Sequence, residues 1–278
     1  MGWNLRRCIG ASAARSRLPR WGRGSFGQDE DISEAIKQIL ENESINIRLS
    51  AECIELKKRG EKVAVNLNCI SGEKTVIGSH ALLAVGRVPN THDLGLEKAG
   101  IAVDQRGYID VDDQLRTSVP GVYALGDCNG RGAFTHTAYN DYEIVAANVL
   151  DGEQRRVSDR IIAYALYIDP PLGRAGKTET EVRKSGRKAL IAKRPMERVG
   201  RAVEKGETQG FMKVLVDAET KEILGASLLG IECDEVIHSM LDVMYAKAPY
   251  TVIQRAIHIH PTVTELIPTM LDELKPLD

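Results

Sequence analysis

Residues 117–128 read TSVPGVYALGDC, and this stretch indicates the class of fold. The apolar run Val122–Leu125 is typical of a short buried strand, and Gly126 and Asp127 follow at its carboxyl end. In open α/β sheets, ligands bind beyond the carboxyl ends of the strands. A carboxylate there can accept hydrogen bonds from a sugar hydroxyl. A Gly-Asp turn also ends many strands that bind nothing, so the dipeptide alone leaves both interpretations open.

The sequence before this stretch predicts the end of an α/β domain. Residues 29–43 place apolar side chains on one face and acidic residues at the start, which is typical of an amphipathic helix. Segments 45–56 and 61–70 alternate apolar and polar residues and predict a strand and a hairpin arm. We expect segment 73–86 to return and to end in a buried strand, Ala81–Val85. A helix before strands, with the last strand buried, suits an α/β domain, but a complete one needs more strands than these.

After the apolar run the pattern changes. Residues 138–152 predict a helix, and 153–160 read as a linker or edge. Strands followed by helices then indicate an α+β domain with an antiparallel sheet. The expected strands are 161–168, 187–193, 210–217 and 222–230, and the expected helices are 178–185, 232–247, 250–256 and 263–274.

Composition limits the possible functions. The chain has 278 residues, 43% of them hydrophobic, and a net charge of −2, which argues against nucleic acid as the main partner. No run approaches the roughly 18 apolar residues of a membrane helix, so no membrane is expected. The five cysteines are scattered without a CxxC or CxxxxC pair, which predicts no metal site and suits reduced thiols in a cytoplasmic protein.

Residues 1–28 differ from the rest, with six arginines and no acidic residue before Asp29. This tail is expected to be disordered or artefactual, and an organellar transit peptide is the alternative. Residues 22–27, GRGSFG, match the dinucleotide-binding pattern GxGxxG literally. That motif needs an apolar strand before it, and RSRLPRW does not read as a buried strand. We therefore interpret the match as non-functional.

Residues 258–265, HIHPTVTE, suggest an acid–base pair. A histidine titrates near neutrality and can take and return a proton, and a carboxylate on its other ring nitrogen would fix the tautomer. The spacing allows this if Pro261 turns the chain and Glu265 lies in the first turn of the following helix. The alternative is an ordinary helix start with Thr262 as the cap. His258 is interpreted as a structural hydrogen-bonding residue.

Three motifs together resemble one known family. TSVPGVYALGD is similar to the flavin ribityl-binding motif of the class I pyridine nucleotide–disulfide oxidoreductases. LLAVGRVPN, residues 82–90, resembles their crossover from the NAD(P)-binding to the FAD-binding domain, and HIHPTVTE resembles their C-terminal active-site motif. The motifs occur in the family's order. The resemblance covers residues 29–278 and is greatest to mercuric reductase and dihydrolipoamide dehydrogenase.

This resemblance implies the cofactors FAD and NAD(P)H and a set of residues that contact them. Asp127 would bind the ribityl chain, and the backbone of residues 133–138 would run along the flavin. Gly86 would let the chain approach the nicotinamide cofactor, and the backbone of Cys53 would lie near its adenosine. The implied FAD-binding residues are Gly126, Asp127, Ala133, Phe134, Thr135, His136 and Ala138. Arg87 receives no role.

The resemblance also implies that His260 and Glu265 are catalytic and that the C-terminal domain forms a homodimer. His260 would then serve the partner's flavin and dithiol. The apolar residues of 232–247 would lie in the dimer interface or in the domain's own core. The implied fold is an α/β remnant of FAD- and NAD(P)-binding domains followed by an α+β dimerisation domain. The expected segments are a basic tail (1–28), the C-terminal parts of the NAD(P)-binding (29–85) and FAD-binding (86–152) domains, and the dimerisation domain (153–278).

The sequence departs from the family's pattern in one important respect. The FAD-binding GxGxxG, the CxxxxC redox pair and the second GxGxxG are missing, so the chain resembles the C-terminal part of such an enzyme. We expect both cofactor sites to be incomplete and turnover to be small or absent. A non-catalytic dimerisation module and a gene fragment remain the alternatives.

Overall fold

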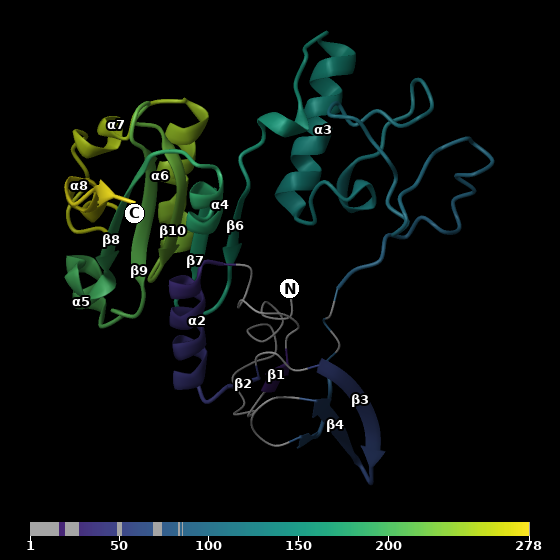
Figure 1. Cartoon of the computed structure of the whole chain (residues 1–278), viewed down its shortest axis with the longest axis horizontal. Coiled ribbons are helices and arrows are strands. Elements are labelled where there is room, and N and C mark those ends of the chain that lie inside the picture. Colours follow the sequence, from purple (N-terminus) through teal and green to yellow (C-terminus); the bar gives the residue numbers. More distant parts are fainter. Residues whose placement is uncertain are drawn as a thin grey trace. The chain divides into compact units, whose positions relative to one another are not determined.

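The computed structural model describes residues 17–19, 28–48, 52–68, 74–82, 84 and 86–277. The chain divides into two compact units (Figure 1). One unit is Val85–Arg160, and the other joins Met1–Ala84 to Ile161–Asp278. Within the described residues, no helix combines the length and apolar character needed to cross a membrane.

A six-stranded sheet forms the centre of the larger unit. Its order is β11-β8-β9-β10-β7-β6, and every neighbouring pair is antiparallel. The α+β domain with an antiparallel sheet is therefore confirmed. The strands are β6 (Ala163–Leu166), β7 (Leu172–Gly176), β8 (Ala189–Pro195), β9 (Phe211–Asp217), β10 (Ile223–Leu229) and β11 (Lys275–Pro276).

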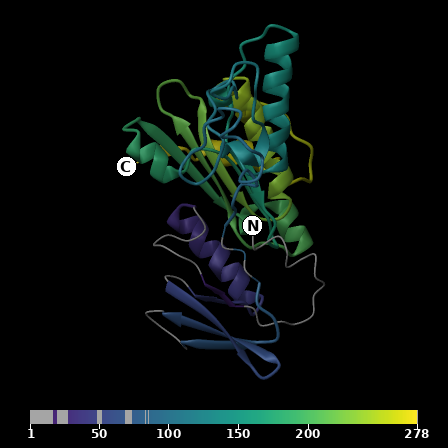
Figure 2. The same ribbon diagram turned by 90° about the vertical axis from the view of Figure 1, so that its right-hand side faces the viewer.

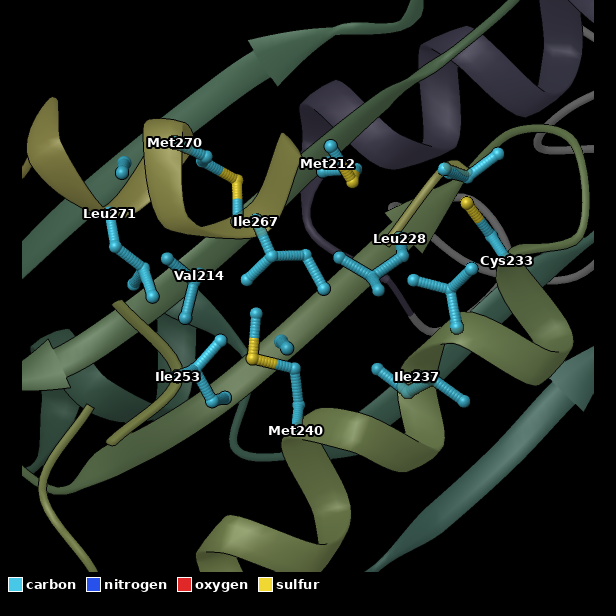
Figure 3. Close-up of a cluster of buried hydrophobic side chains, with 14 of the residues drawn as sticks. Met212, Val214, Leu228, Cys233, Ile237, Met240, Ile253, Ile267, Met270 and Leu271 are labelled. Atoms are coloured by element: carbon cyan, nitrogen blue, oxygen red, sulfur yellow. The ribbon is translucent and has the colours of Figure 1, made fainter. Parts of the chain in front are cut away.

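One face of this sheet packs against three helices, α6 (Cys233–Tyr245), α7 (Thr251–Gln254) and α8 (Leu266–Asp272). Met212, Val214 and Val216 of β9 alternate along the strand and belong to this cluster, as a period of two requires. Figure 3 shows side chains of α6 and α8 converging with those of β9. Val236, Ile237 and Met240 of α6 are buried in the same cluster, so these residues belong to the domain's core.

The intervening strand residues meet two other helices. Phe211 clusters with the apolar face of α2 (Glu30–Asn42), and Leu215 clusters with Val182 of α4 (Glu179–Lys184). Lys213 lies between them in β9. Residues 29–43, expected within the NAD(P)-binding segment, thus form a helix that shares a core with the C-terminal sheet. Figure 2 gives a second view of α2 and this sheet.

The N-terminal segment also forms two small sheets. Strands β3 (Glu52–Arg59), β4 (Lys62–Asn68) and β5 (Thr75–Gly78) are antiparallel. Strand β1 (Arg17–Pro19), which was not predicted, pairs in parallel with β2 (Asn46–Arg48). Residues 1–16 and 20–27, including GRGSFG, lie outside the described residues.

The expected buried strand Ala81–Val85 is wrong. Ala81, Leu82 and Ala84 form no strand and are exposed, whereas Leu83 and Val85 lie outside the described residues. An apolar run becomes a buried strand only where neighbouring strands cover it. Here β5 ends at Gly78, and no described strand pairs with the residues that follow.

The smaller unit is built around α3 (Thr135–Leu150). This helix begins three residues before the expected start at residue 138. The apolar run Val122–Leu125 forms only an isolated bridge, Arg116 with Tyr123, and a second bridge joins Val103 to Ile109. Two 3₁₀ turns complete the unit, η1 (Gly126–Asn129) and η2 (Val157–Asp159).

Several details of the C-terminal domain differ from expectation, among them two elements that were not predicted, α5 (Gly200–Lys205) and β11 (Lys275–Pro276). The last helix, α8, starts at Leu266 rather than at residue 263. Strand β7 was not predicted because glycine and proline surround it. A Cβ atom on Gly173 would lie 2.0 Å from the carbonyl oxygen of Cys233, so this glycine allows α6 to approach the sheet closely. The remaining element is η3 (Met196–Arg198).

Candidate active and flavin-binding site

His260 and Glu265 are brought together in the larger unit. The Nδ1 atom of His260 lies 3.1 and 3.0 Å from the two carboxylate oxygens of Glu265. The His260–Pro261 bond is cis. Glu265 immediately precedes α8, so it does not lie in the first turn of the helix as predicted, and its N–H donates to Thr262 Oγ1 at 3.3 Å. The predicted pair therefore forms, but Thr262 is not the cap of α8, because Glu265 is the residue before the helix and α8 has no side-chain cap hydrogen bond.

The geometry leaves one ring nitrogen of His260 available for chemistry. If Nδ1–H donates to the carboxylate of Glu265, Nε2 carries the lone pair. The side chain of His260 is 81% exposed, whereas that of Glu265 is 14% exposed. The pair can thus accept a proton from a group that approaches from outside the unit.

The neighbouring residues have a different character. His258 Nδ1 lies 3.1 Å from the carbonyl oxygen of Ala256, in accord with a structural hydrogen bond. Ile257 and Ile259 flank it, and both are almost entirely exposed. The segment therefore presents apolar side chains beside an exposed imidazole.

The turn η1 carries Asp127 in the smaller unit. Gly126 has φ +77°, a left-handed conformation that favours glycine. The carboxylate of Asp127 is about half exposed and forms an ion pair with the guanidinium of Arg87. A carboxylate at the surface of a fixed turn suits a hydroxyl-bearing ligand.

The predicted flavin residues of segment 133–138 surround the start of α3. Ala133, Phe134, Thr135 and His136 are exposed. The rings of Phe134 and His136 stack with their centroids 5.2 Å apart. Ala138 is partly buried, and its Cβ lies 3.3 Å from where a Cβ on Gly126 would be. Gly126 and α3 therefore approach each other closely.

Of the two residues predicted to border the NAD(P) site, Gly86 is described in the structure, whereas Cys53 is described only in its backbone. Gly86 has φ +146°, and a Cβ built there would meet no atom within 4 Å. The glycine is thus explained by its backbone conformation, and the space beside it is open. Cys53 belongs to β3, but its side chain lies outside the described residues.

Sequence reasoning missed two residues at this site. Arg87, which received no role, pairs with Asp127 and so connects the crossover at Gly86 with the ribityl motif. Asp141 is a buried carboxylate on α3, one helical turn after Ala138. The signal for Asp141 was its spacing, because residues three apart share a helix face.

The surroundings of the two described free cysteines, Cys128 and Cys233, disfavour the thiolate that a nucleophile needs. Burial raises the pKa of the Cys128 thiol, and the charges of Asp141 and Asp127 act in the same direction. Burial raises the pKa of the Cys233 thiol far above its usual range, with a further contribution from nearby acidic groups. Both thiols stay protonated at neutral pH. Among the described residues, no group of three His, Cys, Asp or Glu side chains is arranged to hold a metal ion.

Two family models match consecutive parts of the chain. The model "Pyridine nucleotide-disulphide oxidoreductase" matches residues 22–141, and "Pyridine nucleotide-disulphide oxidoreductase, dimerisation domain" matches residues 162–271. The chain belongs to the pyridine nucleotide-disulphide oxidoreductase family. This confirms the expected family and the expected fold class.

Particular relatives agree with this assignment. The chain is 34% identical over 265 residues to the probable pyridine nucleotide-disulfide oxidoreductase RclA of Escherichia coli (strain K12), covering 95% of this chain and 57% of the relative. It is 32% identical over 239 residues to a dihydrolipoyl dehydrogenase of Thermus scotoductus, covering 85% of this chain and 51% of the relative. The solved structure "HOCl-induced flavoprotein disulfide reductase RclA from Escherichia coli" matches with a TM-score of 0.85 at 32% identity, covering 92% of this chain and 58% of that one. The chain thus spans about half the length of the curated relatives it matches.

Proposed function

We propose that the chain supplies the C-terminal half of an FAD-dependent pyridine nucleotide–disulfide oxidoreductase. In that reaction, electrons pass from NAD(P)H through the flavin to a disulfide or a related acceptor. The observation that carries the proposal is the His260–Glu265 pair, because its free Nε2 is exposed and can exchange a proton with a dithiol. Glu265 holds the imidazole in one tautomer and orientation, as the third member of a catalytic triad does.

The smaller unit provides part of a flavin site. Asp127 would accept hydrogen bonds from the ribityl hydroxyls, on a turn that Gly126 makes possible. The backbone from Ala133 to Ala138 would lie along the flavin, where the N–H groups at the start of α3 favour an electron-rich edge. When bound, FAD would accept a hydride from NAD(P)H and pass two electrons to the acceptor. Gly86 and the backbone of Cys53 would border the NAD(P) site.

The chain alone is expected to turn over slowly or not at all. Its sequence contains no CxxC or CxxxxC pair to exchange electrons with a disulfide. The described residues around Asp127 fit the ribityl part of FAD, but none of them forms a glycine-rich turn for the pyrophosphate. Both cofactor sites are thus proposed to be incomplete in this chain.

We assign the dimer and the division into segments as part of the same proposal. Residues 29–85 and 86–152 would be the C-terminal parts of the NAD(P)- and FAD-binding domains, and 153–278 the dimerisation domain. Ile257 and Ile259 support a homodimer, because neighbouring exposed apolar side chains are typical of an interface. The proposal places this homodimer in the cytoplasm. Across that interface His260 would serve the partner's flavin and dithiol.

A chimera tests the catalytic role. Residues 29–278 would be joined to the N-terminal part of the E. coli relative, and NADH oxidation with a disulfide acceptor would be followed. His260→Gln should lower the rate by about 10²–10⁴-fold, the usual effect of a lost general base, without loss of bound flavin. His258→Gln, two residues away, is the matched control and should leave the rate within about twofold of the unsubstituted chimera. An equal loss of flavin in His260→Gln would show that His260 is structural.

A second function is a dimerisation module without catalysis. The observation in its favour is that the sheet has a well-covered core on both faces, formed with α6 and α8 on one side and α2 on the other. Co-expression with a full-length relative, followed by size-exclusion chromatography, tests it. Mixed dimers combined with an absence of FAD binding by the chain would favour the module over the enzyme half.

A further inference from the structure

Asp141 is a buried carboxylate that holds several polar groups at once. It lies on α3 and is only 2% exposed. Its Oδ2 atom accepts hydrogen bonds from the N–H of Gly126 at 2.9 Å and from Nδ2 of Asn129 at 2.8 Å. Its Oδ1 atom accepts a hydrogen bond from Nη2 of Arg160. A buried charge with so many donors is compensated by both hydrogen bonds and a counter-ion.

These bonds fix both ends of the turn that carries Asp127. Gly126 is the first residue of η1 and Asn129 is the last. Asn129 Nδ2 also donates to the carbonyl oxygen of Ala124 at 2.9 Å, which ties the turn to the residues before it. Asp127, between the two anchored residues, makes no hydrogen bond to Asp141 and leaves its own carboxylate at the surface beside Arg87.

The same carboxylate aligns two parts of the proposed flavin site. Asp141 lies one helical turn beyond Ala138, and a Cβ on Gly126 would lie 3.3 Å from the Cβ of Ala138. The bond from Gly126 to Asp141 therefore holds the ribityl turn against the helix whose first residues are proposed to contact the flavin.

Arg160 supplies the compensating charge. Its side chain is 10% exposed, and its Nε donates to Oδ1 of Asn140 at 2.8 Å. Because Asn140 and Asp141 are adjacent on α3, the guanidinium is held by two neighbouring acceptors. Hydrogen bonds to a carboxylate are stronger than those to a neutral acceptor, so this ion pair and its neighbouring hydrogen bonds hold the turn firmly.

We propose that Asp141, with Arg160 as its counter-ion, is the positioning residue of the flavin site. It holds the Gly126–Asn129 turn in the conformation that presents Asp127 to the ribityl chain. The proposal rests on the proposed function for its ligand, but its structural step can be measured without flavin.

The experiment uses the full chain with Asp141→Asn. An asparagine keeps the side-chain volume but replaces one acceptor oxygen with a donor and removes the charge, so at least one of the three donors loses its partner. Hydrogen exchange of the Gly126 amide should accelerate by about 10- to 100-fold, as expected for loss of a hydrogen bond to a charged acceptor. FAD affinity, measured by quenching of flavin fluorescence, should fall by about 10-fold or more. The urea midpoint of α3, followed by exchange of its central amides, should change much less.

Asp151→Asn is the matched control, because Asp151 is an exposed acid at the end of the same helix. It should leave exchange and FAD affinity unchanged. If Asp141→Asn fails to fold, Asn129→Ala replaces it, since this change removes one donor and keeps the carboxylate. It should also accelerate exchange within residues 126–129 and weaken FAD binding.

The possible outcomes distinguish the positioning role of Asp141 from the proposed flavin site itself. Unchanged Gly126 exchange in Asp141→Asn overturns the positioning role, and so does unchanged exchange throughout residues 126–129 in Asn129→Ala where that variant is used. Faster exchange with unchanged FAD affinity overturns it as well. If the unsubstituted chain binds no FAD, the proposed flavin site fails in this chain, and the exchange measurement alone decides whether Asp141 holds the turn.

Discussion

Lys213→Met should destabilise the larger unit strongly. Lys213 lies in the middle of β9 and its side chain is 1% exposed. Its ammonium group lies 3.0 Å from Asp29, 2.8 Å from Asp31 and 3.1 Å from Glu179. Methionine has a similar apolar stem, so the substitution removes the charge and leaves little cavity. Three carboxylates would then face one another without their shared cation.

The size of the expected loss of stability depends on the hydrogen-bond partners that the carboxylates keep after the substitution. Breaking a buried ion pair by removing one partner costs about 3–5 kcal/mol. Asp29 keeps hydrogen bonds from the backbone N–H groups of Glu179 and Thr180, at 2.9 and 3.1 Å. Asp31 keeps Lys193 at 3.0 Å. Because these partners remain, the expected loss lies near the lower end, at about 3 kcal/mol.

Urea unfolding followed by circular dichroism, together with hydrogen exchange of α2, measures this loss. Lys193→Met is the matched control. Lys193 pairs with Lys213 across the sheet and also binds Asp31, but 45% of its side chain is exposed. The control should cost less than about 1 kcal/mol. The reasoning is refuted if Lys213→Met costs no more than Lys193→Met, or if α2 keeps its full protection.

Two further predictions concern pH and packing. Burial alone would raise the pKa of Asp29 and of Asp31. Hydrogen bonds from the backbone to Asp29, and from lysine to both aspartates, nevertheless hold each pKa below 3.8. Burial alone would lower the pKa of Lys213, but hydrogen bonds and charge interactions with the two aspartates raise it above 10.5. The cluster's stabilisation is therefore present from about pH 4 to pH 10 and is lost as pH falls through the lowered carboxyl pKa values or rises through the raised lysine pKa. Urea midpoints measured across pH should show this plateau, and a loss already between pH 7 and pH 5 would contradict it. Gly173→Ala should destabilise the same unit by about 1–3 kcal/mol or more, because its Cβ would lie 2.0 Å from the carbonyl oxygen of Cys233. Thermal unfolding measures this effect, and Gly200→Ala, with no atom within 4 Å, should leave the midpoint unchanged or raised.

The sequence predicted the elements of the C-terminal domain well because their patterns are local. The alternating residues of 210–217 became β9 (Phe211–Asp217), and the apolar stripe of 232–247 became α6 (Cys233–Tyr245). The His260–Glu265 contact could also be predicted, since the two residues are only five positions apart and Pro261 lies in the turn between them. In each case the spacing of nearby residues along the chain was sufficient to predict the element or the contact.

Long-range pairing was not predictable in the same way. The apolar residues around Leu82 read as a buried strand, yet Leu82 is exposed, because periodicity does not reveal whether neighbouring strands exist. Arg87 and Asp127 are 40 positions apart, so their ion pair leaves no local signal. The spacing of Asp141 places it on the same helix face as Ala138, but the sequence does not show that Arg160 and Gly126 lie beside it and that it is buried.

Helix α2 shows how one charged residue determines where an amphipathic surface packs. The pattern of Ile32, Ile36 and Ile39 predicts a helix with one apolar face, but any apolar sheet could receive that face. Lys213 makes the packing of α2 specific for β9. A cation at the centre of a fully buried strand requires anions from another element, and the acidic start of α2 provides them through Asp29. The acidic residues at the start of α2 thus interact favourably with the helix dipole and also hold the helix against β9 through Lys213. Because α2 lies within the segment matched by one family model and strands β6 to β10 within the other, the two matched segments share one hydrophobic core.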